Sequence, residues 1–71
     1  MRLPKQAQAN FQRAAMMELG TGFELDAPGA SMRTIRQTEA TCNQLRWQAG
    51  RSGRVRISRG YGDVVKVEAV E

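Results

Sequence analysis

The sequence contains no histidine, a single cysteine (Cys42), two prolines and only 6% aromatic residues. One cysteine excludes an intramolecular disulfide, and the lack of histidine excludes the Cys/His zinc site that stabilises many small domains. No apolar run approaches the roughly 18 residues that a membrane span needs, and residues 1–15 lack the apolar stretch of a secretion signal. We therefore expect a cytoplasmic protein with no metal, no cofactor and no membrane attachment.

What remains is a chain of 71 residues with 41% hydrophobic and 25% charged side chains, the balance of an ordinary globular protein. A chain of this length is one small domain, residues 1–71, and it buries only about 60% of the surface that its unfolded form exposes. Because the usual cross-links are excluded, we expect either efficient packing or association with a partner, such as a second copy of the chain.

Acidic residues are also in short supply, seven against eleven basic residues, which gives a net charge of +4. Residues 33–59 hold seven arginines and a single acid, Glu39. Guanidinium groups bind phosphates and guanine edges bidentately. Such a basic stretch is the electrostatic footprint of a nucleic-acid-binding protein, and a merely solubilising surface is the alternative explanation.

The spacing of apolar residues predicts two helices. The first starts with Pro4 at its first position, continues through residues 5–19 and stops at Gly20, and it carries a narrow, alanine-rich stripe. The second runs from Met32 to about Ala49, with Ser31 as its N-cap. This second helix has the more regular apolar stripe of the two.

Three other segments alternate as strands do: residues 23–25, 54–59 and 64–70. The first is followed by Pro28 and Gly29, which suit the central positions of a type II turn. The fold class predicted is therefore α+β: an N-terminal helix, a short strand, a second helix and a C-terminal β-hairpin. These elements form a two- or three-stranded antiparallel sheet packed on the helices.

The apolar pattern of the hairpin also predicts a register. Pairing Ile57 with Val65 keeps the apolar residues on one face and leaves residues 60–62 as the loop. This register places Arg56 beside Lys66. Such a like-charge pair costs a little free energy, which a bound anion would recover.

The second helix has a polar face opposite its apolar stripe, rich in the planar side chains that match base edges in a DNA major groove. The residues expected to face the groove are Arg33, Arg36, Asn43 and Gln44. Those expected to contact phosphates are Arg51, Arg54, Arg56 and Arg59, with Tyr61 beside them at the hairpin tip. A surface helix that simply needs polar residues is the alternative.

Trp47 points away from the apolar stripe of its own helix, and two interpretations compete. It packs against the N-terminal helix, which we favour because small domains seldom leave a tryptophan in water. Otherwise it is exposed, either as a stacking platform for bases or as an anchor for a protein partner.

Enzymatic chemistry has little support. Without histidine a general base would have to be a carboxylate, lysine or tyrosine, and no pair of carboxylates falls close together on one helix face. Cys42 lies on the apolar stripe and is expected to be a buried, small hydrophobe. We assign no catalytic residue.

Residues 23–70 resemble a loose group of small bacteriophage-encoded proteins, largely uncharacterised. The similarity lies in the short strand at 23–25, the Ser-led helix start at 31–33, the basic glycine loop at 50–56 and the closing segment at 62–67. It implies a phage context. The element order is also similar to a winged helix that lacks one helix, which implies groove reading by the second helix.

These observations favour a non-enzymatic nucleic-acid-binding or regulatory protein, with DNA a better candidate than RNA. The alternative is a protein-binding module, such as a phage-type inhibitor of an acidic host protein. That module would use the basic face, the edge strand 64–70, or the interface-type residues Met16, Met17 and Trp47. A homodimer is compatible with both.

Overall fold

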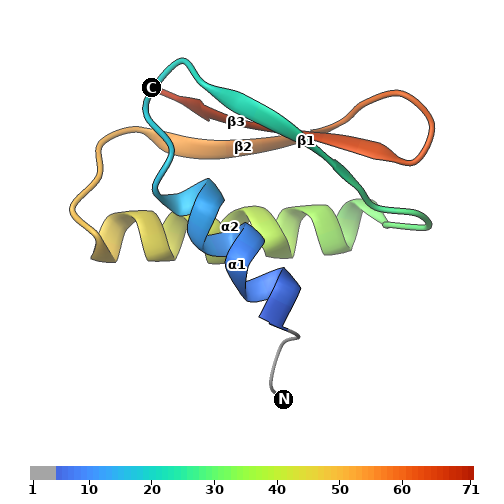
Figure 1. Cartoon of the computed structure of the whole chain (residues 1–71), viewed down its shortest axis with the longest axis horizontal. Coiled ribbons are helices and arrows are strands. Elements are labelled where there is room, and N and C mark those ends of the chain that lie inside the picture. Colours follow the sequence, from blue (N-terminus) through green and yellow to red (C-terminus); the bar gives the residue numbers. More distant parts are fainter. Residues whose placement is uncertain (1–4) are drawn as a thin grey trace.

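The computed structural model describes residues 5–71, so the predicted role of Pro4 lies outside the described residues. The elements follow one another as α1 (Lys5–Ala15), β1 (Gly22–Asp26), α2 (Met32–Gln48), β2 (Arg54–Arg59) and β3 (Val64–Val70) (Figure 1). This order of helix, strand, helix and hairpin confirms the predicted α+β class. None of the described helices is both long enough and apolar enough to cross a membrane.

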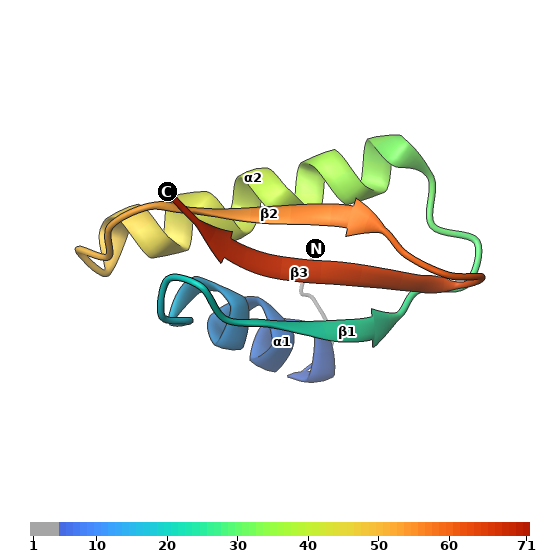
Figure 2. The same cartoon turned by 90° about the horizontal axis from the view of Figure 1, so that it is seen from above.

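The three strands form one antiparallel sheet in the order β1-β3-β2. Both helices lie on the same face of this sheet, with α2 along the β2 side and α1 along the β1 side (Figure 2). Strand β3 is therefore the central strand. The expectation that residues 64–70 form a free edge is wrong, because β1 pairs with the side of β3 that β2 leaves open.

The register of the hairpin differs from the prediction by two residues. Ile57 pairs with Val67, and Arg56 faces Glu68 instead of Lys66. The shift arises because Gly60 joins the ladder, donating its N–H to the Val64 carbonyl at 2.8 Å, so that the turn moves toward the C-terminus. A two-residue shift keeps the apolar face intact but replaces the expected like-charge pair with one of opposite charge. No bound anion is needed to relieve this pair.

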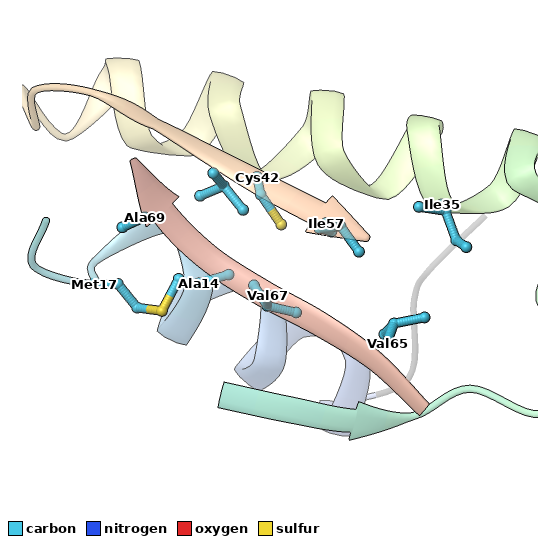
Figure 3. Close-up of a cluster of buried hydrophobic side chains, with 9 residues drawn as sticks. Ala14, Met17, Ile35, Cys42, Ile57, Val65, Val67 and Ala69 are labelled. Atoms are coloured by element: carbon cyan, nitrogen blue, oxygen red, sulfur yellow. The ribbon is translucent and has the colours of Figure 1, made fainter. Parts of the chain in front are cut away.

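The core lies between the sheet and the helices and is built mostly from aliphatic side chains (Figure 3). Strand side chains alternate between the buried and the open face, as the period of a strand requires. Alanines on α1 let this helix approach α2 and the sheet closely. The buried cluster comprises Ala14, Met17, Ile35, Cys42, Val55, Ile57, Val65, Val67 and Ala69.

Cys42 is buried, as expected, with 1% of its surface exposed. Burial raises the pKa of its thiol from 9.0 to about 11, and the charge of Glu39 adds to the shift. In the unfolded chain the thiol ionises first, so the free energy of unfolding is expected to fall as the pH rises from about 9 to about 11. Urea denaturation across this range measures the fall, and Cys42→Ala should flatten it. Parallel profiles for the two proteins would contradict a neutral, buried thiol.

The start of α2 is built as predicted. The Ser31 hydroxyl accepts the N–H of Thr34 at 3.2 Å. In the preceding turn the N–H of Ala30 donates to the Ala27 carbonyl at 3.1 Å. Pro28 and Gly29 occupy its central positions, and Gly29 has the positive φ (72°) that a type II turn needs there.

The end of α1 differs from the prediction, because the helix stops at Ala15 and not at residue 19. The carbonyl groups of Ala15 and Met17 accept hydrogen bonds from the Arg46 guanidinium of α2, at 3.0 and 2.7 Å. The Arg46 side chain thus donates to carbonyls at the end of α1. From the sequence alone, these carbonyls would be expected to bond to the next turn of the helix or to water.

Candidate nucleic-acid interface

A groove of about 520 Å³ runs along the outer edge of β2, between this strand and α2. Residues 54–59 of β2 form one wall, and Arg36 with its neighbours on α2 forms the other. Strand β2 runs antiparallel to α2. The start of β2 therefore lies beside the C-terminal half of α2, and the end of β2 lies beside the N-terminal half. The basic residues that line the groove are Arg36, Arg54, Arg56 and Arg59.

Two polar side chains of α2 close the edge of β2. The Asn43 amide accepts the N–H of Val55 at 2.6 Å and donates to the carbonyl of the same residue at 3.1 Å. The carboxylate of Glu39 accepts the N–H of Ile57 at 2.8 Å. These bonds replace those that a neighbouring strand would make, and they block the edge against pairing. Both the oxygen and the nitrogen of the Asn43 amide are bonded to the backbone of Val55. Asn43 is therefore not available to contact a base, contrary to the prediction.

The remaining polar face of α2 is open. Side chains three or four residues apart follow one another along this helix without any element over them. The exposed residues include Arg33, Arg36, Gln37, Ala40, Gln44 and Trp47. The face contains no acid, and the small side chain of Ala40 at its centre permits close approach of a ligand.

Trp47 is 80% exposed, so the favoured expectation that it packs against α1 is wrong. The reason is that α1 meets α2 through the preceding residue. Arg46 is only 2% exposed, and its guanidinium reaches the end of α1 and, at 2.8 Å, the carbonyl of Ser52. One residue further along a helix points about 100° away. Trp47 therefore points past α1 into solvent.

The burial of Arg46 is the feature that the sequence analysis missed. Its position carried a signal, because it follows Cys42 by four residues and Ile35 by eleven and so shares their buried side of α2. An arginine within an apolar stripe indicates a buried guanidinium that binds backbone carbonyls. Arg46 is thus removed from the basic surface and serves the fold.

The other predicted residues are placed as follows. Arg59 is exposed but its Nη2 donates to the carbonyl of Ala30 at 2.6 Å, which ties the end of β2 to the turn before α2. Arg51 is exposed in the loop between α2 and β2. Tyr61 is 96% exposed at the hairpin tip. The two methionines of the alternative protein interface are split, because Met16 is 46% exposed whereas Met17 belongs to the core.

The acids lie mostly away from this groove. On the open face of the sheet the cross-strand neighbours alternate in sign: Glu24 opposes Lys66, and Glu68 opposes Arg56. The acids of β1 sit on the far edge of the sheet, two strand spacings or roughly 10 Å from β2. Such a separation is about one Debye length at physiological salt. Arg54 and Arg56 alternate with the buried Val55 and Ile57, so their side chains leave β2 on the open face of the sheet, at the edge that borders the groove.

Among the described residues, no group of three or more Cys, Asp or Glu side chains is arranged to hold a metal ion. The sequence matches no protein-family model, and neither a curated protein nor a solved structure gives a significant match to the chain.

Proposed function

We propose that the protein is a small, non-enzymatic nucleic-acid-binding protein, with DNA as its expected ligand, in keeping with the phage-like resemblance of its sequence. The ligand lies against α2 and β2. Arg36, Arg54, Arg56 and Arg59 contact phosphates at the groove and along the β2 edge of the sheet, and Arg33 and Gln44 extend the contact along the exposed face of α2.

The convergence of the arginines carries this proposal. Four arginines from two elements, separated by up to 23 positions in the sequence, border one groove whose lining residues include a single acid, Glu39. The carboxylate of this acid is already engaged by a backbone N–H. A surface that needed charge only for solubility would not require such convergence, whereas a polyanion does.

The test is a salt titration. Binding of the chain to a fluorescently labelled mixed-sequence DNA is followed by anisotropy from low to high salt. Each neutralised phosphate releases counterions, so four contacts predict a slope of log K against log salt of about −3.6 on duplex and about −2.8 on single strands. An affinity that stays flat across the titration, or no binding at low salt, contradicts the proposal.

A protein-binding module, for example an inhibitor of an acidic host protein, is the second candidate. The observation in its favour is the exposure of two large apolar side chains, Trp47 on α2 and Met16 just after α1. A pull-down from host lysate beside a gel shift separates the two functions: a stoichiometric partner without any shift at low salt favours the module. Sedimentation at several concentrations reports whether the chain self-associates.

A further inference from the structure

Trp47 lies in line with the basic groove. It follows Arg36 on α2 by eleven residues, about three helical turns, so the two side chains leave the helix within about 20° of each other and about 16 Å apart along its axis. Asn43, which forms part of the groove, lies between them on the same side of the helix. The indole thus extends the α2 wall of the groove past Asn43, toward the C-terminal end of α2.

Two further arginines follow Trp47 in the sequence and belong to the segment that leads from α2 into β2. Arg51 follows Trp47 by four residues, in a loop that turns back toward β2, and its N–H donates to the Arg46 carbonyl at 3.1 Å. Arg54, the first residue of β2, lies at the same end of the groove. This end of α2 and the start of β2 thus combine an exposed indole of large apolar area with exposed, positively charged arginines. This is the pairing of features that binds a nucleobase together with its phosphate.

The structure also weakens the alternative of reading bases within a duplex. Asn43, one of the four residues expected to recognise base edges, has both ends of its amide bonded to Val55. The indole ring of Trp47 stacks on any unpaired base but has no access to the faces of stacked bases in a duplex. The surface therefore suits recognition of a base by stacking better than recognition by hydrogen bonds to base edges.

We propose that the preferred ligand is single-stranded nucleic acid, with one base stacked on the indole of Trp47 and the neighbouring phosphates held by Arg51, Arg54 and Arg36. This inference rests on the proposed nucleic-acid binding and specifies its substrate. The affinity should depend little on the base sequence of the strand, because every base has a face on which an indole can stack.

The experiment compares three labelled probes: an oligothymidylate of about 15 nucleotides, a duplex of the same length, and an abasic strand that keeps the phosphates. We expect the oligothymidylate to bind at least several-fold more tightly than the duplex and to quench the fluorescence of Trp47, the only tryptophan. Trp47→Ala should weaken binding to the oligothymidylate by about tenfold and leave binding to the abasic strand unchanged. Trp47→Phe should restore most of the affinity.

Met16→Ala is the matched control, because Met16 is an exposed apolar residue just after α1 and its loss should leave all three affinities unchanged. Equal affinity for the oligothymidylate and the abasic strand, with no change in Trp47→Ala, would overturn the stacking inference while the nucleic-acid function stands. Absence of binding to every probe at low salt would refute the function itself.

Discussion

Replacement of Arg46 by leucine is expected to destabilise the protein by about 3–5 kcal/mol, a large share of the roughly 4–10 kcal/mol expected for a chain of this length. The guanidinium donates to the carbonyls of Ala15, Met17 and Ser52, all within 3.0 Å. Leucine fills part of the volume but leaves these carbonyls without a donor. Each hydrogen bond to a charged group contributes about 1.5–3 kcal/mol to stability. When the donor is removed, the buried carbonyl is left without a partner, and its lost hydration is no longer compensated.

Urea denaturation followed by far-ultraviolet circular dichroism measures this loss, since Trp47 is too exposed to report on the core. Arg33→Leu is the matched control: the same change on the same helix at an exposed position should alter the free energy of unfolding by no more than about 0.5 kcal/mol. Arg46→Lys should give an intermediate loss, because one ammonium group lacks the planar fork that reaches three carbonyls. A leucine variant as stable as the wild type would show that the guanidinium does not hold α1 in place.

The fold could be predicted largely because its local signals agree. The N-cap Ser31, the Pro28–Gly29 turn and the alternation in β2 and β3 each act over a few residues, and each is found in the structure. The hairpin register was missed because two registers bury the same face. The choice between them depends on the pairing of Gly60 with Val64, which apolar periodicity does not distinguish.

The errors in the candidate site share one cause, which is contact between elements distant in the sequence. Asn43 looks available on a helical wheel, and only the position of β2 shows that its amide is engaged. Trp47 looks too large for the surface, and only the packing of α1 on Arg46 shows why it stays there. The exposed polar face of α2, by contrast, follows from helical periodicity alone.

Replacing Arg36 and Arg54 together by glutamine is expected to cause the largest loss of nucleic-acid affinity that leaves the fold intact. Both side chains are exposed, and the two residues belong to opposite walls of the groove. At 0.1 M salt each contact with duplex phosphate contributes about 0.9 log unit through counterion release, so two lost contacts weaken binding by about 60-fold. The slope of log K against log salt should fall by about 1.8 on duplex and by about 1.4 on single strands.

The control must remove the same charge elsewhere. Arg13 lies with its guanidinium carbon 4.0 Å from the centre of the Phe23 ring, and Lys66 lies on β3 opposite Glu24, so neither residue lines the groove. Arg13→Gln with Lys66→Gln lowers the net charge equally, and its salt slope should match that of the wild type. If the two double variants lose affinity equally, binding depends on net charge and not on the groove. The assignment of the ligand to α2 and β2 depends on this difference, because only contacts made by Arg36 and Arg54 change the number of counterions released.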